Sequence, residues 1–406
     1  MKKIRNITTI FLAFIMVLGY SGTSKAVLFY EDKISSALAG NLETGQLYYT
    51  VDPDKSVGIA SMSKLMTYYI TKQNIKEGKF KLSDVITVSK AAAFANQAGY
   101  SNMSLTAGVK VTIEDLLKGL LVLSGNDAAV ALAEKVSGTE ANFVKLMNAK
   151  AKELGFKHSV FYNSNGVTIF GDPDTKADDK YNKMSTRELF ALIRNIFKEF
   201  PETSEYAAID QLTIPHLGLD GKSTIPLKNE VKGVIGLKTG TTDEAGYCFS
   251  GVYDISKQDD SQKYKVVTIV TGANGYDMRN KTSLELLNYV TENYEYRPIL
   301  RFSDVSPVTD YKASAYKEDF IPLYLEDAHK DTYLHTKPSD VKITLNEGVK
   351  APYEDGQVLG QVTVMGNDKK EIKINLINKG YKAKVNFISR IGLLFKRILK
   401  GVVGLV

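Results

Sequence analysis

Three short motifs stand far apart in this chain, and a site built from them requires a fold that brings them together. They are Ser61-Met62-Ser63-Lys64, Ser124-Gly125-Asn126 and Lys238-Thr239-Gly240. In this order they supply a nucleophile, a base, a proton relay and a carboxylate anchor, which is what acyl transfer through a serine ester requires. Ser-x-x-Lys alone is weak evidence, since it also occurs at 314–317 and 339–342. The order, the separation and the local context carry the prediction.

The first motif is expected at the start of a buried helix, because an apolar run follows it. Positions three apart share a helix face, so the Lys64 amine would lie beside the Ser61 hydroxyl and could take its proton. A serine at a helix start also lies among unpaired backbone N–H groups, one of which can hold an oxyanion. A capping serine followed by a surface lysine is the alternative.

Lys64 must lose its charge before it can act as a base. An unperturbed lysine has a pKa of about 10.4 and is protonated at neutral pH. Burial lowers this pKa, and a second cation close by lowers it further. We expect Lys238 to be that cation.

The second motif is expected at an exposed corner between two helices, because residues 113–123 and 127–136 are apolar at helical spacing. There the Ser124 hydroxyl could pass a proton between Lys64 and a leaving amine, and the Asn126 amide could bind the substrate's peptide group. A simple turn also favours serine, glycine and asparagine, so the motif taken alone is more often structural.

The third motif is expected on an edge strand, because residues 234–237 and 246–253 predict a strand, a short turn and a second strand. Small residues such as Gly240 let a substrate backbone pair with such an edge. Lys238 and Thr239 would then meet an anionic group at the end of the substrate, and the N–H of Thr241 would complete the oxyanion hole. A solvated edge charge is the alternative role of Lys238.

Over about residues 36–290 the chain resembles the low-molecular-weight penicillin-binding proteins, the serine D-alanyl-D-alanine carboxypeptidase family that shares its catalytic fold with class A β-lactamases. Two further segments match this family, Asn163-Ser164-Asn165-Gly166 and Thr242-Asp243-Glu244-Ala245-Gly246-Tyr247. The resemblance implies that Ser61 is acylated and that Lys64 is its base. It assigns Ser124 and Asn126 to the second motif, and recognition of the terminal carboxylate to Lys238 with Thr239.

The family also carries an arginine beyond the last motif that binds the C-terminal carboxylate. Residues 271–279, which end in Asp277-Met278-Arg279, resemble that segment, and the resemblance implies this role for Arg279. A bidentate guanidinium suits a carboxylate better than an amine does. A solvent-exposed arginine at the start of a helix over 279–290 is the alternative.

Two departures from the family pattern stand out. The family's His-x-Ser-Thr-Ala-Arg stretch appears only as Lys183-Met184-Ser185-Thr186-Arg187, a region that we expect to serve packing. No Glu-x-x-Leu-Asn segment occurs between Asn126 and Lys238. Class A β-lactamases use the glutamate of that segment to activate water, so a long-lived acyl-enzyme with β-lactams is expected.

The two ends of the chain carry its excess of cations. Residues 1–26 predict a signal peptide, with a charged start, an apolar stretch and a small-x-small cleavage site; an uncleaved anchor would need a longer apolar span. Removing this segment deletes four cations and no acid, which takes the net charge from +6 to +2. Residues 385–406 carry four more cations and no acid, so the chain between the two ends is near neutral. A basic face for nucleic acid is therefore not supported.

Residues 385–406 predict an amphipathic helix with cations on one side and apolar residues on the other. Such a helix suits the surface of an anionic membrane, and packing on the preceding domain is the alternative.

The fold class predicted is α+β, with an antiparallel sheet flanked by helices in a catalytic domain over 27–296, followed by a small all-β domain over 297–384. In the smaller domain we expect strands at 332–335, 341–345, 357–365 and 371–377. This domain has no catalytic constellation, and we expect it to act as a spacer.

Cys248 is the single cysteine, which excludes an intramolecular disulfide, and it is predicted to be a buried core residue. The four histidines form no ligand or triad spacing, so neither a metal nor an organic cofactor is implied.

The sequence therefore predicts an exported, membrane-held serine DD-carboxypeptidase that removes the terminal D-alanine from peptidoglycan stem pentapeptides through an ester on Ser61. β-Lactams are expected as covalent inhibitors. A DD-transpeptidase and a non-catalytic penicillin-binding sensor or scaffold remain open alternatives.

Overall fold

The computed structural model describes residues 30–95, 100–171, 178–256, 265–294, 309–312, 320–326, 341–347, 353–365 and 371–379. The predicted signal peptide at 1–26 and the predicted membrane helix at 385–406 lie outside these residues. Within the described ranges, every helix is too short or too polar to cross a membrane.

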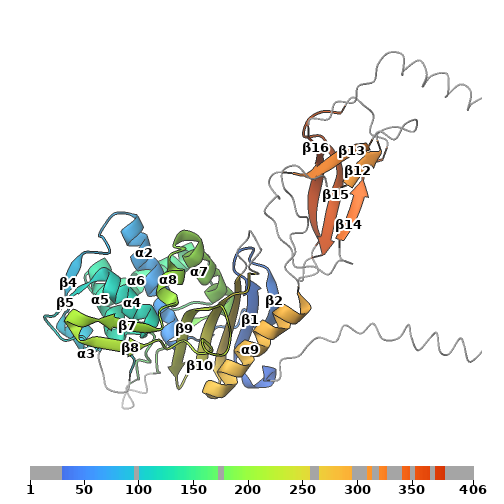
Figure 1. Ribbon diagram of the computed structural model, residues 1–406. Coiled ribbons are helices and arrows are strands. Elements are labelled where there is room, and N and C mark those ends of the chain that lie inside the picture. The colour runs from blue at the N-terminus through green and yellow to red at the C-terminus, as the bar shows by residue number, and fades with distance from the viewer. Residues whose placement is uncertain are drawn as a thin grey trace, which may run out of the picture.

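A five-stranded antiparallel sheet forms the centre of the larger part of the chain (Figure 1). Its strands lie in the order β2-β1-β11-β10-β9. Their bounds are Ser36–Asn41 for β1, Leu47–Val51 for β2, Val234–Thr242 for β9, Gly246–Asp254 for β10 and Lys265–Ala273 for β11. The pairing of β1 with β11 places Ser36 opposite Thr271 and joins the start of this region to its end. β9 lies last in the order, so one of its edges has no strand neighbour among the described residues.

The two faces of this sheet are covered by different helices. Successive residues of a strand point to opposite faces, and accordingly Leu38 lies in one apolar cluster while Ala37 and Ala39 lie in the other. The helix α9 (Tyr276–Asn293) packs against β11, β10 and β1 on the second face. Buried Leu286 of α9 belongs to the cluster on that face.

The remaining helices gather on the other face of the sheet (Figure 1). They are α2 (Lys64–Lys76), α3 (Lys90–Phe94), α4 (Ile113–Val122), α5 (Asn126–Ser137), α6 (Glu140–Glu153), α7 (Thr186–Glu199) and α8 (Thr203–Ala207). α2 contacts α4, α5, α6 and α7, and all its residues from 64 to 72 are buried. The helix that carries the first motif is therefore central to the helical layer.

Side-chain caps fix where several of these helices begin. Thr112, Thr139 and Ser185 each accept a hydrogen bond from the backbone N–H three residues further on, at the starts of α4, α6 and α7. The shorter elements are η1 (Glu31–Lys33), β3 (Val57–Gly58), η2 (Ala60–Ser63), β4 (Val85–Thr87), β5 (Lys110–Thr112), β6 (Lys183–Met184), β7 (Gln211–Ile214), η3 (Pro215–Leu217) and β8 (Leu219–Lys222). Of these, β3 pairs with β6, β4 with β5, and β7 with β8.

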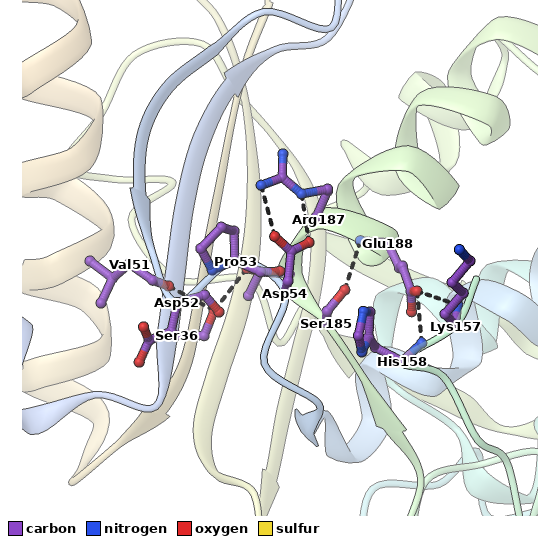
Figure 2. Close-up of polar contacts among 11 residues, drawn as sticks. Ser36, Val51, Asp52, Pro53, Asp54, Lys157, His158, Ser185, Arg187 and Glu188 are labelled. Carbon is purple, nitrogen blue, oxygen red and sulfur yellow. Dashed lines mark hydrogen bonds and ion pairs between the residues drawn. The ribbon is translucent and has the colours of Figure 1, made fainter. Parts of the chain in front are cut away.

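The start of α7 joins the β2–β3 loop to the turn after α6 (Figure 2). Arg187 pairs with Asp54 at 2.7 Å, and Thr186 Oγ1 lies 2.8 Å from Ser36 Oγ. The Glu188 carboxylate accepts bonds from the backbone N–H groups of Lys157 and His158. This region therefore serves packing, as predicted for residues 183–187.

A second antiparallel sheet contains β12 (Thr309–Lys312), β13 (Phe320–Leu325), β14 (Val341–Leu345), β15 (Val358–Met365) and β16 (Glu371–Asn378), in the order β12-β13-β16-β15-β14. Three of these strands match predicted ones, and β12 and β13 were not predicted from the sequence. The strand predicted at 332–335 lies outside the described residues. The α+β fold class with an all-β C-terminal region is confirmed, whereas the domain limits at 26, 296 and 384 stay a prediction.

The helix of the first motif begins later than the sequence predicts. Ser61 lies in the 3-10 turn η2, and the α-helix starts at Lys64. Ala60 has a φ of +45°, a conformation that an α-helix does not accommodate. Met62 N bonds to Ile59 O and closes a tighter turn around Ser61.

Candidate active site

The Ser61 hydroxyl and the Lys64 amine are in hydrogen-bond contact. Lys64 Nζ lies 2.8 Å from Ser61 Oγ, and it also donates to Asn126 Oδ1 and to the carbonyl oxygen of Asn165, both at 2.7 Å. The amine is completely buried. Three fixed oxygens therefore hold the lysine in place, and one of them is the hydroxyl that would attack.

The environment of Lys64 favours its neutral form. Burial lowers the pKa of Lys64 well below its usual value, and the charge of Lys238 lowers it further. The Asp127 carboxylate acts in the opposite direction and raises this pKa. The lowered pKa of Lys64 agrees with the prediction from the sequence. The opposing effect of Asp127 on this pKa was not predicted.

Asp127 also fixes the segment beside the second motif. Its completely buried carboxylate accepts hydrogen bonds from the backbone N–H groups of Met103, Leu105 and Ala128. Asn126 N in turn donates to Ser101 O at 3.0 Å. These bonds attach residues 101–105 to the start of α5.

The second motif connects α4 to α5, as predicted, but it is buried rather than exposed. Ser124 and Asn126 are each 3% exposed, because α2, α3, α4 and α6 surround α5. Asn126 Oδ1 reaches Lys64, which ties this motif to the first. Ser124 has a φ of +61°, an uncommon conformation for a residue other than glycine.

The third motif lies on β9 and packs directly against the nucleophile. A Cβ atom added to Gly240 would lie 2.8 Å from Ile59 O and 3.0 Å from Ser61 N. Any larger side chain would therefore push β9 away from η2. Thr239 Oγ1 lies 3.3 Å from Thr224 Oγ1, whereas Thr241 is exposed.

Lys238 and Arg279 form a pair of buried cations. Burial lowers the pKa of Lys238 to about 7, with a further contribution from the charge of Arg279. Lys238 Nζ donates to Thr239 O at 3.0 Å. In the part of the chain that the structure describes, neither cation forms an ion pair with a carboxylate.

Arg279 lies in the first turn of α9 and is only 5% exposed, which rules out the solvent-exposed alternative. Its Nε and Nη2 both donate to Asn280 Oδ1, and its guanidinium carbon lies 5.1 Å from the centre of the Tyr276 ring. These contacts orient the guanidinium. The cation is thus held in place by neutral groups.

The segment 163–166 supports the site, a role that we did not predict. Asn165 O binds Lys64, and Ser164 O accepts a bond from Thr67 Oγ1 of α2. Gly166 has a φ of +85°, and a Cβ atom there would lie 2.0 Å from Ala60 O. The glycine in a short polar run was the available sequence signal for such a close approach.

Cys248 is buried on β10, and burial raises the pKa of its thiol to about 12. It is a core residue, as predicted. Among the described residues, no group of three or more His, Cys, Asp or Glu side chains is placed to hold a metal ion.

This arrangement suits acyl transfer. It places a serine hydroxyl beside a buried amine of lowered pKa, next to an edge strand and two cations that form no ion pair with a carboxylate of the described residues.

Solved structures share this architecture. The chain is similar to a peptidoglycan synthesis regulatory factor (PBP3) from Streptococcus pneumoniae, with 28% identity and a TM-score of 0.66 over 86% of this chain and 98% of that one. It is also similar to penicillin-binding protein 5 from Haemophilus influenzae, with 26% identity and a TM-score of 0.63 over 86% of this chain and 96% of that one. The fold is that of the penicillin-binding proteins.

Sequence comparison defines the family. Residues 25–275 match the family described as D-alanyl-D-alanine carboxypeptidase. The D-alanyl-D-alanine carboxypeptidase DacF of Bacillus subtilis is 29% identical over 81% of this chain and 80% of its own length. DacC of Escherichia coli is 29% identical over 80% of this chain and 78% of its own length. The chain belongs to the D-alanyl-D-alanine carboxypeptidase family and has serine D-Ala-D-Ala carboxypeptidase function, which confirms the family and the activity predicted.

Proposed function

We propose that this carboxypeptidase removes the terminal D-alanine from peptidoglycan stem peptides through an ester on Ser61. The observation that carries the proposal is the contact of 2.8 Å between the buried Lys64 amine and the Ser61 hydroxyl. A lysine whose pKa is lowered by burial and by a neighbouring cation can accept the hydroxyl proton near neutral pH.

Three features support substrate binding on β9: an edge with no strand neighbour among the described residues, Lys238 on the strand itself, and Arg279 on α9. The substrate backbone adds to β9, and its terminal carboxylate meets Lys238, Thr239 and Arg279. The carboxylate supplies an anion for the two buried cations, which pair with no carboxylate in the part of the chain that the structure describes. Asn126 uses Oδ1 to hold Lys64, so its Nδ2 can donate to the substrate's peptide carbonyl.

The acylation step begins with attack of Ser61 Oγ on the penultimate carbonyl carbon while Lys64 takes the hydroxyl proton. The backbone N–H groups of Ser61 and Thr241 bind the oxyanion. The C–N bond then breaks, and the leaving nitrogen receives its proton through Ser124, so that D-alanine departs as an amine. Gly240 lets the two oxyanion donors approach each other, because no Cβ separates β9 from η2.

Deacylation returns the enzyme to its starting state. Water attacks the ester carbonyl and gives a proton to Lys64, and the Ser61 oxygen leaves with that proton as the hydroxyl re-forms. If an amine attacks in place of water, the product is a new peptide bond, which is the transpeptidase reaction.

β-Lactams are proposed as covalent inhibitors at the same serine. One support comes from penicillin-binding protein D2 of Listeria monocytogenes, solved in a cefotaxime-bound form, which is 28% identical with a TM-score of 0.54 over 63% of this chain and 96% of that one. The absence of a Glu-x-x-Leu-Asn segment between Asn126 and Lys238 favours slow release of the acyl group.

The outer surface of the cytoplasmic membrane is the proposed location. The charged start and apolar stretch of residues 1–26 favour export, and the amphipathic pattern of residues 385–406 favours attachment to an anionic membrane surface. The β-rich residues 297–384 would then hold the active site away from the membrane.

One experiment separates the proposed reaction from its alternatives. The purified protein is incubated with a stem pentapeptide and a free amino acceptor, and the products are weighed by mass spectrometry. We expect the tetrapeptide and free D-alanine. A ligated product would identify a transpeptidase, and an acyl-enzyme without turnover would identify a sensor or scaffold.

A further inference from the structure

Glu244 lies in the turn between β9 and β10, next to the substrate edge, and the catalytic steps above do not use it. Its Oε2 accepts a hydrogen bond from the Thr168 hydroxyl, which joins this turn to the segment that holds Lys64. Ala245 also contacts the chain that leads to Ser61, since a Cβ on Gly58 would lie 2.9 Å from Ala245 Cα. Thr168 therefore holds the Glu244 carboxylate, and the next residue, Ala245, packs beside the chain that leads to the nucleophile.

The direction of the substrate places its upstream residues near this turn. A peptide that pairs antiparallel with β9 and has its carboxylate at Lys238 and Thr239 must run from the end of β9 toward its start. Its scissile carbonyl lies near Thr241, the proposed oxyanion donor. At about 3.3 Å per residue, the residue that precedes D-Ala-D-Ala then lies beyond Thr241, on the side of Glu244.

The active site and Glu244 are close enough for a long substrate side chain to reach from one to the other. Asn165, whose carbonyl binds Lys64, and Thr168, whose hydroxyl binds Glu244, are three residues apart and so at most about 10 Å apart. A lysine-type side chain on the residue before D-Ala-D-Ala covers much of such a distance while its backbone stays on β9.

The chemistry of Glu244 suits a cation. The bond from Thr168 occupies Oε2 and leaves the lone pairs of Oε1. No lysine, arginine or histidine of the described residues forms an ion pair with this carboxylate. Ile169 and Phe170, which follow Thr168, are 44% and 66% exposed and offer apolar surface for the methylene groups of a long side chain.

We propose that Glu244 is a specificity-determining residue that binds a positively charged side chain on the residue preceding D-Ala-D-Ala. This inference rests on the proposed function, because it uses the direction of the substrate along β9. It names the class of substrate, peptides that carry a free amine at that residue.

The test compares two peptides that differ only in one charge. They are acyl-L-Lys-D-Ala-D-Ala with a free ε-amine and the same peptide with the ε-amine acetylated. For the unaltered enzyme we expect kcat/KM to be about three- to tenfold higher for the free amine, mainly through KM, since a partly exposed charged hydrogen bond has that strength. The preference should decrease as salt is added.

Two variants assign the preference to Glu244. Glu244→Gln keeps an acceptor for Thr168 and removes the charge, so it should bring the ratio close to one without changing the rate for the acetylated peptide. Asp243→Asn removes the same charge from the adjacent exposed residue and should keep the ratio. The rate of acylation by penicillin reports whether each variant is folded.

The outcomes are distinct. Equal rates for both peptides with the unaltered enzyme, or an unchanged preference in Glu244→Gln, would overturn the inference while leaving the carboxypeptidase mechanism in place. If neither peptide is cleaved or forms an acyl-enzyme, the proposed function fails and the inference fails with it. If Glu244→Gln does not fold, a preference of the unaltered enzyme that does not decrease as salt is added would still overturn the inference.

Discussion

The positive charge of Lys238 lowers the pKa of Lys64, and both amines are completely buried. Burial is the larger cause, and the second cation adds to it. The base and the carboxylate anchor of this enzyme are therefore coupled electrostatically. A change at the anchor should alter the pH dependence of the base.

The first prediction concerns this coupling. Lys238→Met removes a repulsive charge from the surroundings of Lys64, so protonation of Lys64 becomes easier and its pKa rises. Since acylation requires neutral Lys64, the acid limb of the rate of acylation by penicillin should move to higher pH. The measurement is the second-order acylation constant across pH, with the exposed Lys232→Met as the control. An acid limb that stays in place or moves to lower pH would show that Lys238 does not act on the base.

The second prediction concerns Arg279. Arg279→Ala removes a charged hydrogen-bond donor for the substrate carboxylate, so kcat/KM for the pentapeptide should fall by about 10- to 100-fold. Acylation by penicillin should fall less, because its strained ring is reactive and its rigid shape needs less positioning. Both rates are measured on the same preparation. Equal losses on the two substrates would mean that Arg279 is structural.

The third prediction separates two neighbouring residues of α7 (Figure 2). Glu188 is 8% exposed and accepts bonds from Lys157 N, His158 N and Ser159 Oγ, so Glu188→Ala should lower the free energy of unfolding by about 2–4 kcal/mol. Arg187 and Asp54 form an exposed pair, and Arg187→Ala should cost less than about 1 kcal/mol. Urea unfolding of both variants is the measurement. Similar losses would mean that the exposed pair is as important as the buried carboxylate.

The fourth prediction concerns the C-terminus. Truncation after Lys384 should release an active enzyme from membranes, and a peptide of residues 385–406 should bind anionic vesicles and become helical. Sedimentation and circular dichroism are the measurements, and uncharged vesicles are the control. Truncated protein that still sediments with membranes would contradict the anchor, while loss of folding would favour packing on the β-rich domain.

Much of the fold could be predicted because the local sequence patterns favour the same helices and strands that the tertiary structure contains. The helices around the second motif and the strands β9 and β10 follow from periodicity and turn residues. β12 was missed because it is only four residues long, and β13 was missed because Pro322 interrupts its apolar run. The later start of α2 was missed because alanine at position 60 carries no signal for a positive φ.

The residues of the three motifs could be identified from the sequence. The residues that position them or adjust their pKa could not. Asp127 looks like an acidic residue in the first turn of a helix, and only tertiary structure shows that it is buried and acts on Lys64. Asn165 contributes a backbone carbonyl, which any residue possesses. Glu244 gains its position from the contact with Thr168, which lies on another segment.

The central claim is that Ser61 forms the ester, and mass spectrometry of the acylated protein tests it most directly. The enzyme is incubated with penicillin, digested, and mapped for the peptide that carries the added mass. We expect the adduct on Ser61, its complete loss together with peptidase activity in Ser61→Ala, and its retention in Ser339→Ala, which alters another Ser-x-x-Lys segment. An adduct that persists in Ser61→Ala, or that maps to any other residue of the unaltered enzyme, would contradict the account.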